Sequence, residues 1–197
     1  MRMRSISGMI ADTLWNQGII QKEDIDKCRY GLDVFISSAL EVASILVIAA
    51  VMRNFLQTLL FFASFIPLRV YAGGYHADTK LRCYFVSLAV YAGFTIVMYI
   101  LPVKAYLAAA LSATAFTVTM ILSAAPVIHK NKSVNDAERK YYRKFSIRIC
   151  LVETAMVLLS AAVFPESRFA VSLALGQAAV AFSMIAAVIK GKMAEKE

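Results

Sequence analysis

The sequence is poor in charged residues and lacks the composition of a soluble domain. Charged side chains make up 17% of its 197 residues, and 60% of the residues are hydrophobic. Soluble domains typically contain about 25% charged and about 45–50% apolar residues. The composition therefore predicts an integral membrane protein. Because no Pro-, Gly- or Ser-rich linker and no convincing repeat divides the chain, one membrane domain is expected.

Several motifs are missing as well. No CxxC pair occurs among Cys28, Cys83 and Cys150, so neither a zinc knuckle nor a disulfide framework is indicated. No Gly-rich loop followed by Lys is present, so nucleotide hydrolysis is not expected. The residues after Arg2 and Arg4 form no apolar run, which argues against a signal peptide. We expect no cofactor and no metal.

Six apolar runs predict an all-α protein with six transmembrane helices. A spanning helix needs about 20 residues, within a range of about 17–25. Four runs reach that length, whereas the second and fifth are shorter, with 15 and 16 residues. The second stops near Pro67 and Arg69 and is either a tilted or locally thinned span, or ends in a watery cavity. The runs are 32–52, 54–68, 84–101, 105–125, 149–164 and 169–189.

The basic residues predict the orientation of these spans. Of the 21 Lys and Arg, 18 fall in the N-terminus, the loops 69–82 and 126–148, and the C-terminus. The other three are Arg53, Lys104 and Arg168, one in each remaining loop. Basic residues concentrate in cytoplasmic loops, so we expect a multi-pass plasma-membrane protein with both termini cytoplasmic. The net charge of +8 follows from this rule and does not indicate nucleic acid.

The N-terminal segment has an amphipathic pattern. Ile6, Met9, Ile10 and Leu14 share one helical face at spacings of three and four. This pattern fits a helix on the cytoplasmic leaflet of the bilayer, or equally a helix packed on its own protein. We expect a cytoplasmic N-terminal segment (1–30), a six-helix transmembrane domain (31–190) and a cytoplasmic tail (191–197).

The loop "RVYAGGYHADTKLRC", residues 69–83, carries the reactive side chains. A cysteine thiolate is a good nucleophile and forms more readily beside a base or a cation. His76 is a candidate base for Cys83, because imidazole titrates near neutral pH. Gly73 and Gly74 permit positive φ and close backbone approach. These are the parts of a cysteine protease, with Arg69, Lys80 and Arg82 adding positive charge.

The spacing limits this interpretation. His76 and Cys83 are seven positions apart. On a straight helix their Cα atoms would be about 10.5 Å apart, which is too far for a hydrogen bond between the side chains. We therefore expect the glycines to unwind the His76 end, and Asp78 is a candidate to orient His76. Two alternatives remain: Cys83 is only a small buried hydrophobe, or His76, Asp78 and Cys83 hold a metal, although a fourth ligand is not evident.

The residues "LRVYAGGYHADTKLRC" resemble the signature of the AgrB (accessory gene regulator B) family of membrane peptidases. The family pattern is Leu-Arg, a short variable gap, which is three residues here, then Gly-Gly-Tyr-His-Ala, and a cysteine seven residues after the histidine. Further support comes from "YGLDVFISS" and from "APVIHKNKSVNDAERKYYRK", in which Ser133 replaces the usual proline. The matching positions are Leu68, Arg69, Gly73, Gly74, Tyr75, His76, Ala77 and Cys83.

The resemblance implies a six-helix transmembrane peptidase that processes an AgrD-type precursor peptide of quorum sensing. Cys83 would be the nucleophile and His76 the general base, with Arg69, Gly73, Gly74 and Asp78 in support. The acyl-enzyme thioester would then pass to a residue of the peptide, closing a thiolactone or lactone ring. The family also implies a homodimer.

A basic cytoplasmic face suits an acidic peptide tail, with Lys80, Arg82, Lys130 and Lys132 as candidate contacts, although the positive-inside rule alone explains these charges. The alternative functions are a non-catalytic peptide-export subunit and a membrane scaffold. Asp33, Glu41 and Glu153 are acids in or near spans, where such residues are functional candidates. We assign none of the three to catalysis.

Overall fold

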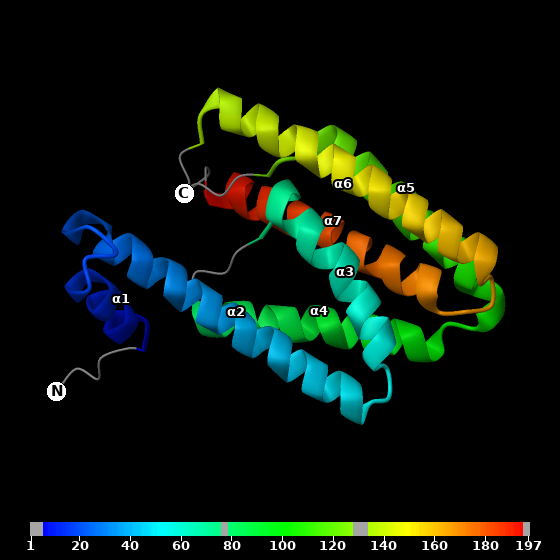
Figure 1. The fold of residues 1–197 in the computed structure, drawn as a ribbon. Coiled ribbons are helices and arrows are strands. Elements are labelled where there is room, and N and C mark those ends of the chain that lie inside the picture. The colour runs from blue at the N-terminus through cyan, green and yellow to red at the C-terminus, as the bar shows by residue number, and fades with distance from the viewer. Residues whose placement is uncertain (1–5, 76–78, 128–133, 195–197) are drawn as a thin grey trace. The chain divides into compact units, whose positions relative to one another are not determined.

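The computed structural model is built from helices (Figure 1). It describes residues 6–75, 79–127 and 134–194, without the side chains of Lys80 and of residues 192–194. Two single-turn 3-10 helices, Lys22–Asp24 and Val103–Ala105, precede α2 and α5. The α-helices are α1 (Ile6–Asn16), α2 (Ile25–Val51), α3 (Phe55–Ala72), α4 (Lys80–Ile100), α5 (Tyr106–Ala124), α6 (Asp136–Val163) and α7 (Phe169–Ala194).

The predicted fold class is confirmed. Helices α2 to α7 are each long and apolar enough to cross a membrane, and they correspond in order to the six predicted runs. In the described part of the chain, the only β-type pairing is one isolated bridge between Gly73 and Val127. The chain is therefore a multi-pass membrane protein.

Helix α6 begins earlier than its apolar run. The sequence predicted a span over 149–164 behind a basic loop, but the helix starts at Asp136. Asn135 caps it: its side chain accepts a hydrogen bond from the N–H of Glu138 at 2.8 Å, and the Glu138 side chain accepts one from the N–H of Asn135 at 3.1 Å. This reciprocal capping box satisfies two backbone donors at the helix start, so the basic segment after it is helical.

Helix α3 also extends beyond its predicted run of 54–68. It continues through Pro67 and Arg69 and ends at Ala72. A proline is tolerated inside a transmembrane helix because neighbouring groups can satisfy the backbone that it frees. The longer helix has 18 residues, which lies within the spanning range.

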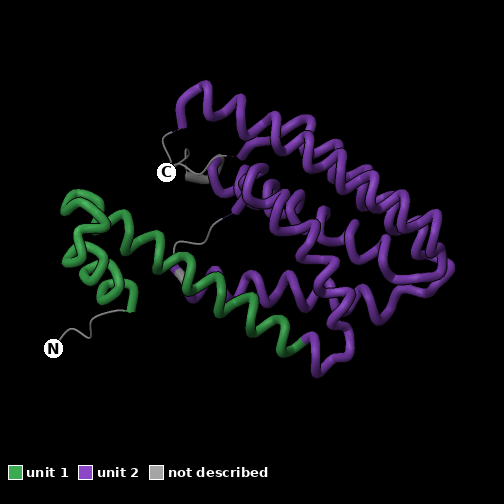
Figure 2. The backbone as a smooth tube through the Cα atoms, in the orientation of Figure 1, with its two compact units in different colours: residues 1–48 green, residues 49–197 purple. Residues whose placement is uncertain are grey.

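The structure divides into two compact units, residues 1–48 and 49–197 (Figure 2). In the first unit, α1 buries its small residues Ser7, Gly8 and Ala11. The Ser7 hydroxyl donates to Asp33 Oδ1 at 2.5 Å, and Arg29 lies 3.4 Å from Asp12. The apolar side chains of α1, among them Ile6 and Met9, stay exposed. Helix α1 therefore contacts α2 through small residues, and these apolar side chains remain exposed.

The second unit is organised around α7. This helix packs against α3, α5 and α6, and α5, α6 and α7 run side by side in Figure 1. A Cβ on Gly176 of α7 would lie 2.2 Å from Ser64 Oγ of α3, whose hydroxyl donates to the Leu173 carbonyl at 2.7 Å. Small residues allow such close approach between membrane helices, and this approach fixes α3 against α7.

Helix α4 packs on α3 through residues in the middle of α4. The Tyr91 hydroxyl donates to Asn54 Oδ1 at 3.1 Å and lies 3.1 Å from Thr58 Oγ1. The rings of Phe61 and Phe94 have centroids 4.7 Å apart. These side chains are buried and hold the middle of α4 on the first half of α3.

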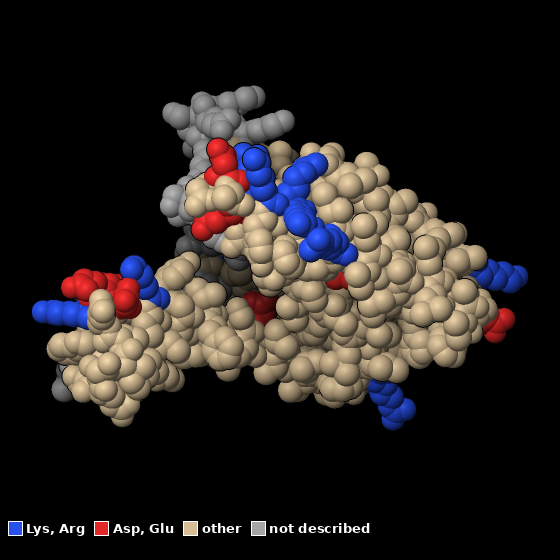
Figure 3. Space-filling model, turned by 45° about the horizontal axis from the view of Figure 1, so that its top comes forward, with Lys and Arg blue, Asp and Glu red and all other residues tan. Residues whose placement is uncertain are grey.

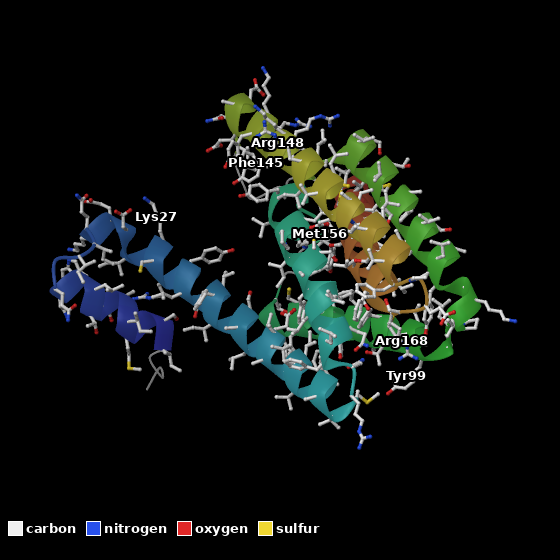
Figure 4. The ribbon with its side chains drawn as sticks, turned by 45° about the vertical axis from the view of Figure 1, so that its right-hand side comes forward. Lys27, Tyr99, Phe145, Arg148, Met156 and Arg168 are labelled. Atoms are coloured by element: carbon white, nitrogen blue, oxygen red, sulfur yellow. The ribbon has the colours of Figure 1, made fainter. Side chains whose placement is uncertain are left out.

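Basic side chains gather at one end of the second unit. Figure 3 shows a cluster of Lys and Arg on this face, where Arg139, Lys140, Arg143 and Lys144 are exposed on the first turns of α6. Arg148 follows, with its guanidinium 5.8 Å from the ring centroid of Phe145. Arg168 lies at the opposite end of the bundle (Figure 4).

Candidate active site

The predicted unwinding at the glycines is confirmed. Helix α3 ends at Ala72 and α4 begins only at Lys80. Gly73 has φ 76° and Gly74 has φ 133°, values that side-chain-bearing residues rarely adopt. Thr79, just before α4, is extended, so the helix that contains Cys83 begins only three residues before it.

Gly73 lies directly against another loop. Its neighbour Ala72 accepts a hydrogen bond from the N–H of Val127 at 2.9 Å, which forms the isolated bridge. A Cβ on Gly73 would lie 2.1 Å from the Val127 carbonyl oxygen. Val127 follows the C-terminal end of α5. At this helix end, the carbonyls of Leu122 and of the capping residue Ala125 accept hydrogen bonds from Arg143 at 3.0 and 2.8 Å. Glycine is required at position 73 because the backbone of this turn packs directly against the backbone of Val127.

Gly74 lies between two side chains. A Cβ at this position would lie 2.4 Å from Arg69 Nη1 and 2.7 Å from Ser183 Oγ. Arg69 stands one turn before the end of α3, and Ser183 belongs to α7. The glycine therefore lets an arginine and a serine from different helices reach the backbone that precedes His76.

Tyr75 is held at its backbone and at its ring. Its N–H donates to the Ser183 carbonyl oxygen at 2.9 Å and to Ser183 Oγ at 3.1 Å. Its carbonyl oxygen accepts a hydrogen bond from Arg69 Nη2. Lys190 Nζ lies 5.2 Å from the centroid of the Tyr75 ring, within the range of a cation–π contact. The residue before His76 thus has a fixed position.

Cys83 lies in the first turn of α4. Thr79 caps this helix: its hydroxyl accepts from the N–H of Arg82 at 3.3 Å, and its carbonyl accepts from the N–H of Cys83 at 3.0 Å. The Cys83 side chain is half-buried, whereas Arg82 is exposed. Arg69 and Cys83 lie close enough to interact electrostatically.

Arg69 connects these features. Its Nη2 binds the Tyr75 carbonyl, while Nη1 is buried and makes no hydrogen bond within the described part of the chain. A guanidinium offers five N–H donors in a fixed plane, so Arg69 can brace the glycine turn and still present a donor beside Gly74. Of the predicted supporting residues, Arg69, Gly73 and Gly74 come together here with Cys83 nearby.

The other predicted site residues stay predictions. His76, Asp78, Lys130 and Lys132 lie outside the described residues, as does the side chain of Lys80. Among the residues that are described, no three His, Cys, Asp or Glu side chains gather as a metal site. The alternative metal site of His76, Asp78 and Cys83 is not tested by this observation, because His76 and Asp78 lie outside the described residues.

The remaining cysteines have different surroundings. Cys150 is 3% exposed and belongs to a buried apolar cluster with Leu68, Ile121, Val180 and Met184. Cys28 is half-buried on α2. The environment of Cys150 is that of a small core side chain.

Sequence reasoning missed Ser183, Val127 and Lys190. Ser183 is one small polar residue in an apolar span, 108 positions from Tyr75, and no local pattern marks it. Val127 and Lys190 are likewise unremarkable in the sequence. The packing of α7 against α3 brings Ser183 and Lys190 to the glycine turn, and the segment after α5 brings Val127 there.

Comparison with known proteins gives a family match over most of the chain. The family model of accessory gene regulator B matches residues 7–188. The accessory gene regulator protein B of Staphylococcus carnosus (strain TM300) is 24% identical over 172 residues, covering 77% of this chain and 89% of that protein. AgrB-like protein 1 of Clostridium perfringens (strain 13 / Type A) is 26% identical over 109 residues, covering 55% of this chain and 57% of that protein.

No solved structure matches the chain. The family match covers nearly all of the described helices, including the glycine turn and the start of α4. The chain therefore belongs to the accessory gene regulator B family, membrane proteins involved in processing autoinducing peptides for quorum sensing.

Proposed function

We propose that this protein is a membrane cysteine endopeptidase that cleaves an AgrD-type precursor peptide at the cytoplasmic face and supports its cyclisation. One observation carries the proposal. The turn that leads into His76 is braced by Arg69, and Arg69 also lies within electrostatic reach of Cys83. A fixed turn and a nearby cation are what a nucleophilic thiol paired with histidine requires.

Cys83 is the proposed nucleophile. It belongs to the first turn of a helix, where the helix dipole stabilises negative charge, and the Arg69 guanidinium adds to that effect. An anionic sulfur is the form that attacks a peptide carbonyl. His76 takes the thiol proton as the general base, and Asp78 orients its ring.

The first step exchanges one acyl bond for another. The Cys83 sulfur bonds to the scissile carbonyl carbon, and the carbonyl electrons move to oxygen. Arg69 Nη1, whose hydrogen-bonding capacity is unused within the described residues, supplies a donor to this oxyanion beside Gly74. The C–N bond then breaks, the leaving amine takes the proton from His76, and a thioester remains on Cys83.

The second step regenerates the enzyme. A thiol or hydroxyl within the peptide attacks the thioester carbonyl, gives up its proton to His76 and displaces the Cys83 sulfur. The product is a thiolactone or lactone. The acidic tail of the precursor, which is released in the first step, is bound by basic side chains of the enzyme. These are Lys80, Arg82, Lys130 and Lys132. Since a ring thioester is less stable than the peptide bond it replaces, removal of the products would draw the reaction forward.

The partners follow from the same proposal. The substrate is a precursor peptide presented at the bilayer, the active form is a homodimer, and no cofactor takes part. We place both termini and the 69–83 loop in the cytoplasm because 18 of the 21 basic residues lie in those segments. The domain limits 1–30, 31–190 and 191–197 belong to this proposal.

Intact-mass analysis tests the mechanism. Purified protein is mixed with a precursor whose ring-closing residue has been removed, so that the second step cannot occur. We expect an adduct heavier by the peptide without its tail, released by hydroxylamine, which cleaves thioesters but not amides. Cys83→Ala should form none and His76→Ala less, while Cys28→Ala and Cys150→Ala serve as matched controls that still form it.

Two results would count against the proposal. Release of the tail without any hydroxylamine-sensitive adduct would favour a water-activating mechanism and reopen the His76–Asp78–Cys83 metal alternative. Failure of the folded protein to cleave a cognate precursor at all would favour a non-catalytic export subunit or scaffold.

A further inference from the structure

Glu153 is a buried acid that the proposed chemistry does not use. It lies in the middle of α6 with 5% of its surface exposed, and Cys150 and Val157 on either side of it along the helix are also buried. Among the described residues, neither carboxyl oxygen has a hydrogen-bond partner of good geometry. An unpaired charge buried inside a membrane protein is costly. The protonation state of the Glu153 carboxyl therefore decides whether this site is stable.

Gln177 of α7 lies against it. This residue is fully buried, and neither its Oε1 nor its Nε2 has a hydrogen-bond partner of good geometry in the described part of the chain. Gln177 is nevertheless the side chain that interacts with Glu153, although the pair does not meet the geometry of a hydrogen bond. Four buried polar atoms without other partners therefore meet between α6 and α7.

The charged surroundings offer Glu153 no counter-ion. No Lys or Arg within the described residues forms an ion pair with it. Helix α5 has no charged residue, α7 has none before Lys190, and α3 has only Arg69, at the glycine turn. The titratable side chain that interacts with Glu153 is Cys150, on its own helix.

Donor counting distinguishes the two forms of the acid. An ionised Glu153 has only acceptor oxygens, so Gln177 Nε2 could donate to it but Gln177 Oε1 would stay unsatisfied. A protonated Glu153 adds one O–H donor. That donor can bind Gln177 Oε1 while Gln177 Nε2 donates to the other carboxyl oxygen. Between these two side chains, the reciprocal pair formed by the protonated acid satisfies all four atoms, whereas the ionised form does not.

We propose that Glu153 is an intramembrane proton-binding site, held in its neutral form by a reciprocal hydrogen-bonded pair with Gln177. The ligand of this site is a proton, and the site connects α6 to α7. Loss of the proton would leave a buried carboxylate without a counter-ion and break the reciprocal pair. The site is separate from the glycine turn and does not depend on peptidase activity.

Infrared spectroscopy tests this on the purified full-length protein in lipid nanodiscs at neutral pH. A protonated carboxyl has a C=O stretching band distinct from the two bands of a carboxylate. We expect Glu153→Gln to lose one carboxylic-acid band that shifts in heavy water. Glu166→Gln, which changes an exposed loop acid, is the control and should lose carboxylate absorption instead. Loss of carboxylate absorption in Glu153→Gln would overturn the proposal.

Two further arms keep the test decisive. Gln177→Leu should retain the acid band but move it to higher frequency, because the carbonyl loses its donor; an unshifted band would overturn the pairing. If Glu153→Gln does not fold, the spectrum of Gln177→Leu tests the proposed pair on its own. The wild-type spectrum should be the same in sodium chloride and in choline chloride. An acid band that appears only without sodium would identify a metal-cation site and reject the proton assignment.

Discussion

The backbone N–H of Tyr75 donates hydrogen bonds to both the carbonyl oxygen and Oγ of Ser183, 108 residues away, at 2.9 and 3.1 Å. This pair ties the turn after α3 to the middle of α7. Because Arg69 holds the carbonyl of the same residue, Tyr75 is fixed at both of its peptide groups. The position of His76 in the proposed mechanism depends on this attachment.

Enlarging Ser183 should impair cleavage without preventing membrane insertion. Ser183→Leu places bulk where Ser183 Oγ already lies close to Gly74, so the turn must move. A displacement of about 1 Å at a catalytic group can cost about 100-fold in rate, and we expect a loss of about 10–100-fold in precursor cleavage. Ser183→Ala keeps the hydrogen bond to the backbone oxygen and should have a much smaller effect.

Ala186→Leu is the matched control for this change, because Ala186 is an exposed residue of the same helix. It should cleave the precursor at the wild-type rate. Equal rates for Ser183→Leu and Ala186→Leu would show that the attachment of Tyr75 does not matter for activity.

Gly73→Ala should abolish most activity. The new Cβ would lie 2.1 Å from the Val127 carbonyl oxygen, and its backbone has φ 76°. Backbone atoms cannot move aside as a flexible side chain can, so we expect the turn to shift and cleavage to fall about 100-fold or more. Gly93→Ala on α4, where a Cβ meets nothing within 4 Å, should cleave normally. Normal rates in both variants would contradict the required close approach.

Cys150→Ala should affect stability and not chemistry. Its side chain is 3% exposed within an apolar cluster, so shortening it leaves a small void and should lower the free energy of unfolding by on the order of 1 kcal/mol. Thermal unfolding in detergent measures this loss, and thioester formation with the truncated precursor should be unchanged. A Cys150→Ala protein that is folded yet forms no adduct would shift the nucleophile assignment away from Cys83.

The orientation in the membrane can be tested by labelling. In a chain whose native cysteines are replaced by alanine, Lys80→Cys should resist an impermeant maleimide in intact cells and react after permeabilisation. Lys104→Cys, in the loop before α5, should react from outside. The reverse pattern would invert the topology and remove the proposed access of a newly made peptide to the site.

The spans were the most predictable feature. The run 105–125 and the helix Tyr106–Ala124 differ by one residue at each end, because hydropathy is a local property that neighbouring residues report directly. The extensions of α3 and α6 were missed because they lie outside the apolar runs. The capping box at Asn135 and Glu138 was a readable signal for α6, whereas a proline and an arginine concealed the end of α3.

The sequence by itself determined the membrane class, the six spans and the glycine turn between Arg69 and Cys83. These depend on composition, on local apolar runs and on residues that permit positive φ. Only the tertiary structure decided that Ser183 holds Tyr75, that Val127 requires Gly73, and that Gln177 lies against Glu153. Each of these contacts joins residues far apart in the chain, so it depends on how the helices pack and not on a local sequence pattern; at Ser183 a glycine permits the close approach.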